Sequence, residues 1–145
     1  MAHGSVLMHF GSKEKLFLAA VPGPRDLDEL VDGDPATLPE RIAHGFVSHM
    51  EAPDADDPLV AVIRAAATNQ QAAVNLYAAM HERSIAAYSK VFDVPDALPR
   101  LELMASLLIG ATFKRYILRY GPLAAMSPVE LEGHLARAIR GILSD

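Results

Sequence analysis

Helix-start signals recur along the chain from residue 37 onward, and they constrain its fold more than any other feature of the sequence. Each signal is a side chain that can cap a helix N-terminus, followed by a proline in the first turn or by a glutamate or glutamine three residues later. Ser127-Pro128-Val129-Glu130 combines the cap with both later features and is the strongest signal. The others are Thr37 with Glu40, Asp57 with Pro58, Thr68 with Gln71, and Asp96 with Pro99.

The apolar periodicity between these starts predicts helices over 38–51, 58–67, 69–92, 97–119 and 128–143. No stretch alternates polar and apolar residues for long enough to predict a strand. The sequence therefore predicts an all-α fold. The stretch from Val21 to Asp34 is rich in Pro, Gly and Asp and divides residues 1–21 from a helical body at 22–145, although its apolar spacing near Leu27 is also that of a short helix.

The predicted helix over 97–119 is apolar on every side at its centre. A helix without a polar face has to be covered all round, so we expect one face to meet a second subunit, with small residues such as Gly110 allowing a close approach. The alternative is a monomer in which this helix is simply the central core helix. Gly121-Pro122 ends the helix, and the helix over 128–143 has an apolar stripe, so the two can form an antiparallel pair.

The predicted helix over 69–92 mixes aromatic and polar residues on its apolar face, where His81 interrupts Tyr77, Ile85 and Tyr88. Aromatic and methionine side chains with a few polar groups line small-molecule pockets. They also occur in ordinary helical cores, in which a lone histidine is a hydrogen-bonded core or rim residue. From the residues alone both interpretations stay open.

Composition and charge argue against several functional classes. A net charge of −5, spread over the chain, argues against a nucleic-acid surface on the helical body. The absence of cysteine excludes a disulfide framework, a thiolate metal site and a cysteine nucleophile, and a cytoplasmic location is the default. The longest uncharged apolar run, Leu103 to Phe113, is far shorter than the roughly 20 residues that cross a membrane, so no membrane partner is expected.

Enzyme chemistry is not expected either. Glu40/His44 and Glu130/His134 are spaced i, i+4, whereas di-metal helical bundles use Glu-x-x-His at i, i+3. Both glutamates can instead serve in capping boxes. The sequence contains neither a Gly-rich phosphate loop after a strand nor a nucleophile elbow. We therefore expect no catalytic residues, no metal and no cofactor.

The most specific motif lies at the beginning of the chain, where residues 4–16 read Gly-Ser-Val-Leu-Met-His-Phe-Gly-Ser-Lys-Glu-Lys-Leu. Ser12 is a good helix cap, and a helix N-terminus beside Lys13 is a fair phosphate site. The segment resembles the DNA-reading unit of TetR-type transcriptional regulators, which reads Gly-Thr-Leu-Tyr-x-His-Phe-x-Ser-Lys-Glu-x-Leu. The matching residues are Gly4, Ser5, His9, Phe10, Ser12, Lys13, Glu14 and Leu16. Leu7 replaces the family's aromatic residue, so a phenol contact to phosphate is absent.

This resemblance implies a TetR-like ligand-binding and dimerisation bundle at 22–145, joined to a truncated helix-turn-helix remnant at 1–21. We expect specific DNA binding to be lost in this chain, while a full-length form would bind an operator. The residues that the resemblance places at DNA are His3, Gly4, Ser5, Met8, His9 and Lys13.

The resemblance also implies a repressor that senses an unidentified small molecule in its core and forms a homodimer through its last two helices. The pocket candidates are Phe46, Met50, Tyr77, His81, Met104 and Phe113. The interface candidates are Leu108, Ile109, Leu131, Leu135 and Ile139. The alternatives are a headless protein that dimerises with or titrates a full-length regulator or sequesters a ligand, and, from another class, a helical-bundle enzyme.

Overall fold

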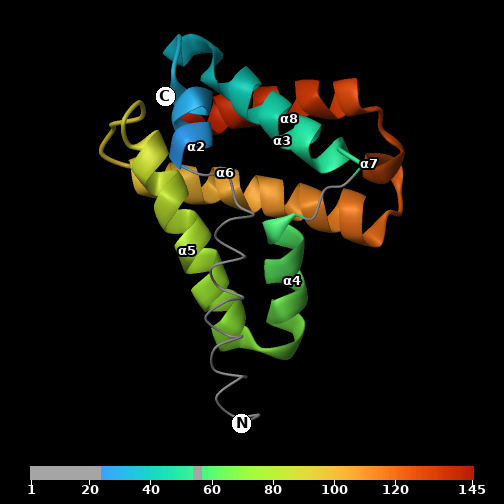
Figure 1. Cartoon of the computed structure of the whole chain (residues 1–145). Coiled ribbons are helices and arrows are strands. Elements are labelled where there is room, and N and C mark those ends of the chain that lie inside the picture. The colour runs from blue at the N-terminus through green and yellow to red at the C-terminus, as the bar shows by residue number, and fades with distance from the viewer. Residues whose placement is uncertain (1–23, 54–56) are drawn as a thin grey trace.

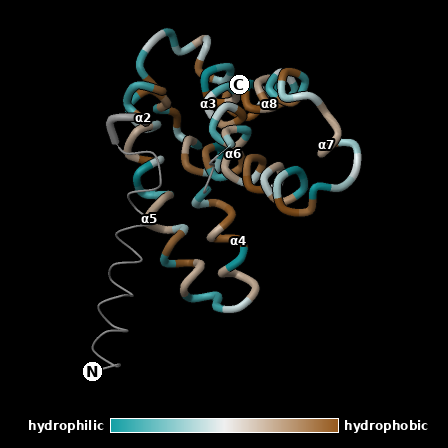
Figure 2. The backbone as a smooth tube through the Cα atoms, turned by 45° about the vertical axis from the view of Figure 1, so that its right-hand side comes forward, coloured by the Kyte–Doolittle hydropathy of each residue, from teal (hydrophilic) through white to brown (hydrophobic). Residues whose placement is uncertain are grey.

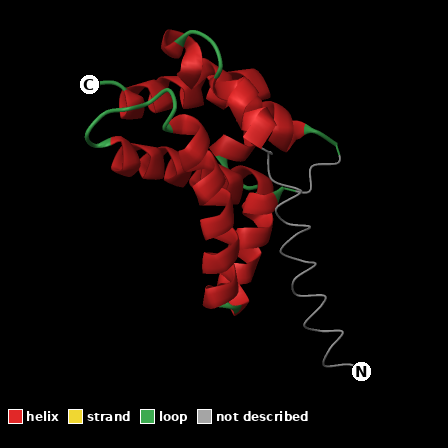
Figure 3. Cartoon of the chain, turned by 60° about the vertical axis from the view of Figure 1, so that its left-hand side comes forward, coloured by secondary structure: helices red, strands yellow, loops and turns green. Residues whose placement is uncertain are grey.

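The computed structural model describes residues 24–53 and 57–145 of the chain. Every regular element in these ranges is a helix (Figure 3), so the prediction of an all-α fold is confirmed. In chain order they are α2 (Pro24–Val31), the 3-10 helix η1 (Pro35–Thr37), α3 (Leu38–Glu51), α4 (Pro58–Thr68), α5 (Gln70–Tyr88), α6 (Ala97–Ala111), the π-helix η2 (Thr112–Leu118), α7 (Pro122–Ala125) and α8 (Pro128–Leu143).

The predicted helices differ from the observed ones mainly at their C-terminal ends. α5 ends at Tyr88 rather than at residue 92, because the next N–H groups, those of Lys90 and Val91, donate to carbonyls only three residues back and tighten the chain into a turn. The predicted helix over 97–119 is divided, since α6 ends at Ala111 and the chain continues as η2 with the wider turn of a π-helix. The short helix expected near Leu27 is α2.

The starts of α4 and α8 are capped as predicted. Asp57 accepts a hydrogen bond from Leu59 N–H at 2.7 Å. Ser127 and Glu130 form a reciprocal capping box, with both hydrogen bonds at 3.2 Å. At the start of α5 the cap is Asn69 rather than Thr68, and its side chain accepts from Ala72 N–H at 3.1 Å.

The predicted side-chain caps at Thr37 and Asp96 are wrong. Thr37 ends η1 with a ψ of 5°, not in the extended conformation of an N-cap, so its hydroxyl turns back and donates to the Asp34 carbonyl at 3.0 Å. Glu40 pairs instead with Arg140 of α8, whose hydrogen bond lowers the pKa of the Glu40 carboxyl. Asp96 accepts from Arg100 at 2.9 Å and makes no cap bond.

The helices are arranged around α6, which runs through the middle of the molecule (Figure 1). α3 and α8 pack against each other on one side of it, and α4 and α5 form a hairpin that extends from the other side. α2 contacts both α3 and α5 and therefore bridges the two groups. α8 runs back along α6 and η2 in the opposite direction, with α7 at the turn (Figure 1), as predicted for an antiparallel pair.

The centre of the core lies between the amphipathic faces of α3 and α8. Ile42 of α3 and Leu131 and Ile139 of α8 expose at most 3% of their surface. Hydrophobic and hydrophilic segments alternate along the helices in Figure 2, as expected for helices with one buried face. Leu101 and Met104 of α6 belong to the same core.

An arginine holds the turn between α2 and α3. The Arg41 guanidinium donates hydrogen bonds to the carbonyl oxygens of Leu30 and Asp34, both at 2.8 Å, and to that of Asp32. Gly33, in the same turn, has a φ of 124°, which glycine adopts at little cost because it has no Cβ. These contacts fix the position of α2 against α3.

Candidate ligand-binding site

A cavity of about 330 Å³ lies between α2, α3, α5 and α6, beside the start of α4. Small-molecule pockets typically measure roughly 300–1,000 Å³, so this cavity is large enough for a compact organic ligand. All five helices contribute side chains to its wall.

Three of these helices give the cavity an apolar wall. The apolar residues that α2, α3 and α6 contribute include Leu27, Leu30, Ile42, Phe46, Met104 and Leu108. α6 is the helix that the sequence shows to be apolar on every side. One apolar face of α6 lines the cavity, since Leu108 and Ile109 border the cavity and remain partly accessible to solvent.

α5 gives the cavity a mixed wall, in which polar and aromatic groups lie beside Met80 and Ile85. Tyr77, His81, Ser84 and Tyr88 all border the cavity. Their spacing of four, three and four residues places them on one face of an α-helix with 3.6 residues per turn. The helix therefore presents a row of hydroxyl and imidazole groups toward an otherwise apolar space.

His81 and Tyr77 form a stacked pair on this wall. Their rings lie 5.5 Å apart between centroids at an interplanar angle of 17°. His81 Nε2 lies 3.0 Å from Glu102 Oε1 of α6, a contact that joins α5 to α6. Burial, and to a lesser extent the negative charge of Glu102, raises the pKa of the Tyr77 hydroxyl.

Tyr88 lies at the other end of the row and exposes only 7% of its surface. Burial raises the pKa of its hydroxyl to about 12. Neither the Tyr77 nor the Tyr88 hydroxyl makes a hydrogen bond to any residue that the structure describes. Both groups are protonated at neutral pH and can donate to a molecule in the cavity.

A second histidine–carboxylate pair borders the cavity where α3 ends and α4 begins. His49 Nε2 lies 2.8 Å from Asp57 Oδ2, and Asp57 exposes 7% of its surface. The other Asp57 oxygen caps α4 through Leu59 N–H. Both oxygens of this buried carboxylate are therefore already engaged.

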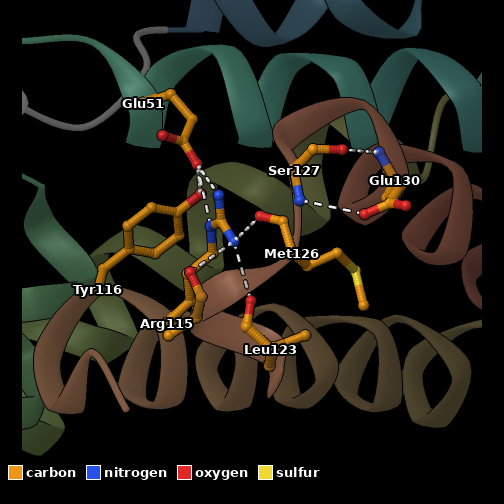
Figure 4. Close-up of polar contacts among 8 residues, drawn as sticks. Glu51, Arg115, Tyr116, Leu123, Met126, Ser127 and Glu130 are labelled. Carbon is orange, nitrogen blue, oxygen red and sulfur yellow. Dashed lines mark hydrogen bonds and ion pairs between the residues drawn. The ribbon is translucent and has the colours of Figure 1, made fainter. Parts of the chain in front are cut away.

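A polar network joins the end of α3 to η2 and to the chain that leads into α8 (Figure 4). Arg115 donates to Glu51 Oε1 from Nε at 2.9 Å and from Nη2 at 2.6 Å. Its Nη1 donates to the carbonyl oxygens of Leu123 and Met126 at 2.9 and 2.6 Å. The Tyr116 hydroxyl donates to the same Glu51 oxygen at 3.0 Å, and burial together with this hydrogen bond raises its pKa to about 12.

This network touches the cavity through one aromatic contact. The ring of Phe46, on the cavity wall, meets the ring of Tyr116 edge to face with centroids 6.4 Å apart. The last turns of α3 therefore carry cavity residues on one side and bonds to η2 on the other.

Across residues 24–53 and 57–145, no group of three or more His, Asp or Glu side chains is close enough to hold a metal ion. No helix within these ranges is long and apolar enough to cross a membrane.

The sequence matches the family of tetracyclin repressor-like C-terminal domains over residues 36–143, which is most of the chain. The chain belongs to this family. Searches of curated proteins and of solved structures found no match. The matched range starts just before α3 and ends with α8, so it contains nearly all of the cavity wall and the whole Arg115 network of this TetR-like domain.

Of the residues that the sequence suggested for a pocket, the TetR-like domain brings four together on the cavity wall, namely Phe46, Tyr77, His81 and Met104. Met50 is buried, with 7% of its surface exposed, but does not border the cavity. Phe113 lies on η2 with 41% of its surface exposed, away from the cavity. The sequence reasoning missed Ser84, Tyr88, His49 and Asp57; the spacing from Tyr77 and His81 could have revealed the first two.

Three of the five suggested interface residues lie in the core of the subunit. Leu131, Leu135 and Ile139 expose only 1%, 4% and 0% of their surface, because they pack inside the subunit against α3. We therefore reassign them from the expected interface to the core. Leu108 and Ile109 border the cavity. The residues suggested for DNA contact, His3 to Lys13, lie outside the described residues.

Proposed function

We propose that the chain is the regulatory part of a TetR-like transcriptional repressor, and that its effector is a small molecule bound in the cavity between α2, α3, α5 and α6. The observation that carries this proposal is the cavity itself, an apolar space with unpaired hydroxyl groups inside a TetR-like domain. No catalytic group and no cofactor is needed for this role.

Ligand binding in the cavity can affect the rest of the domain through contacts at the C-terminal end of α3. A ligand that displaces the Phe46 ring would also displace Tyr116 of η2, because the two rings are in contact. Glu51, at the same end of α3, accepts a hydrogen bond from Arg115 of η2. A ligand changes the balance between two conformations only by binding one of them more tightly. We propose that the orientation of η2 and α8 is what differs between the two.

We further propose a homodimer through α6, η2 and α8. Leu103 and Phe113 expose 60% and 41% of their surface, and exposed apolar side chains that lie together on one face mark sites of interaction with another protein. Gly110 of α6 and Gly141 of α8 are both exposed, and a Cβ built on either meets no atom within 4 Å. Large apolar residues beside open glycines suit close packing of a second subunit.

Operator DNA is the partner that we propose for the complete regulator, with the cytoplasm as the compartment. This part of the proposal rests on the resemblance of residues 4–16 to a TetR-type DNA-reading unit and on the family of the domain.

The cavity can be tested with N-phenyl-1-naphthylamine, a neutral probe whose fluorescence rises in apolar surroundings. We expect saturable binding of one probe per chain. Ala105 borders the cavity, so Ala105→Phe should fill the space and abolish the fluorescence increase. Ala78→Phe is the matched control, because Ala78 is exposed on α5 and does not border the cavity. Equal binding by both variants would contradict the proposal.

A further inference from the structure

The cavity has two chemically distinct sides. α2, α3 and α6 supply mainly aliphatic side chains and the ring of Phe46, whereas α5 supplies the row Tyr77, His81, Ser84 and Tyr88 beside Met80 and Ile85. A ligand that satisfies both sides must have an apolar body and polar atoms along one edge.

The carboxylate, imidazole and guanidinium groups on the wall already have partners. Asp57 is paired with His49 at 2.8 Å, and His81 with Glu102 at 3.0 Å. Arg83 also borders the cavity and is engaged in an interaction of its own. A charged ligand would have to displace one of these partners or remain unpaired in an apolar space, which is costly.

The hydroxyl groups on the wall still have hydrogen-bonding capacity, in addition to the second ring nitrogen of His49 and of His81. The hydroxyls of Tyr77 and of the largely buried Tyr88 make no hydrogen bond to described residues, so each can donate. Ser84 Oγ donates to the Met80 carbonyl at 3.2 Å and so has only its lone pairs left to accept. A ligand hydroxyl, which both accepts and donates, matches all three groups.

The rings and thioether groups of the cavity wall favour a ligand with a flat aromatic body. The stacked rings of Tyr77 and His81 offer a planar face, and Phe46, Met80 and Met104 offer the ring edge and thioether contacts that aromatic groups favour.

We propose that the ligand of this cavity is a neutral aromatic molecule that carries hydroxyl groups along one edge, held by Tyr77 and Tyr88. This inference rests on the proposed sensing function and specifies its ligand class. It also assigns Tyr77 and Tyr88 as the residues that distinguish hydroxylated aromatics from hydrocarbons of the same shape.

A matched series of probes tests the ligand class on the full chain. Calorimetric titration would compare biphenyl, biphenyl-4-ol, biphenyl-4,4′-diol and biphenyl-4-carboxylate. Each hydroxyl should tighten binding about fivefold, the effect of one net hydrogen bond, and the carboxylate should bind more weakly than biphenyl-4-ol.

Tyr77→Phe and Tyr88→Phe test the residue assignment, because each keeps the ring and removes only the hydroxyl. Either variant should weaken binding of the diol about fivefold and leave biphenyl unchanged. Tyr120→Phe is the matched control, since Tyr120 is 87% exposed, and it should change neither affinity.

The outcomes separate this inference from the proposed function. Equal binding of all three uncharged probes, tightest binding of the carboxylate, or unchanged diol affinity in both tyrosine variants would overturn the ligand class while leaving a ligand-binding cavity. Binding of none of the four probes would overturn the ligand class, and failure of the naphthylamine probe as well would count against a sensing cavity altogether.

Discussion

Replacing Arg115 by methionine should lower the free energy of unfolding by about 3 kcal/mol. The Arg115 side chain is only 8% exposed, and its hydrogen bonds join Glu51 of α3 to the carbonyl oxygens of Leu123 and Met126 (Figure 4). Methionine fills much of the same volume, so the cost comes from the acceptors that are left without a donor rather than from a void.

The magnitude follows from the burial of these acceptors. Leaving a buried acceptor unpaired costs roughly 1–3 kcal/mol, and removing one partner of a buried ion pair roughly 3–5 kcal/mol. The Glu51 side chain is 34% exposed, so water recovers part of its solvation and the lower end applies. With a urea m-value of about 2 kcal/mol per molar, the unfolding midpoint should fall by about 1.5 M.

Urea unfolding followed by circular dichroism measures this change. Arg137→Met is the matched control, because Arg137 is exposed and its hydrogen bond is to neighbouring His134; its effect should be within about 0.5 kcal/mol. Equal midpoints for the two variants would show that the Arg115 network does not stabilise the subunit.

Two further predictions concern alkaline pH and helix capping. The pKa of Tyr88 in the folded state, about 12, lies above the ordinary value of 10. The protonated Tyr88 hydroxyl therefore contributes about 3 kcal/mol to the free energy of unfolding below pH 10, and this contribution is lost as the pH rises toward 12. Urea midpoints measured between pH 9 and 11.5 should fall less steeply for Tyr88→Phe than for the unmodified chain; equal slopes would contradict the assignment. Ser127→Ala should lower the free energy of unfolding by about 1 kcal/mol and Thr37→Ala by less, because only Ser127 makes a cap bond. Thermal unfolding of both variants checks this, and a larger loss for Thr37→Ala would be the contrary result.

The helices were predictable because their signals are local. Ser127, Asp57 and the prolines that follow them mark helix starts through contacts within one turn, and the structure retains those contacts. Thr37 and Asp96 have the same local pattern but other partners. The Thr37 hydroxyl donates to the Asp34 carbonyl in the preceding 3-10 turn, and the Asp96 carboxylate accepts from Arg100 one helical turn later. Local patterns fail where a neighbour in space or sequence offers a stronger partner.

The direction in which each helix packs was less predictable. The apolar stripe with Leu131 and Ile139 was recognised, but a stripe does not say whether α3 or a second subunit covers it. Phe46 and Met50 lie one turn apart on α3, yet only Phe46 borders the cavity. The Arg115 network depends on backbone carbonyls of a distant turn and has no signature in the spacing of residues.

The proposed dimer of this TetR-like domain can be tested by the mass of the protein in solution. Light scattering at micromolar concentration should give the mass of two chains. Gly110→Arg, which places a long charged side chain on the exposed face of α6, should give the mass of one, while Ala78→Arg on α5 should remain a dimer. A single-chain mass for the unmodified protein would rule out the proposed dimer, and a dimer that persists in Gly110→Arg would rule out an interface on this face of α6.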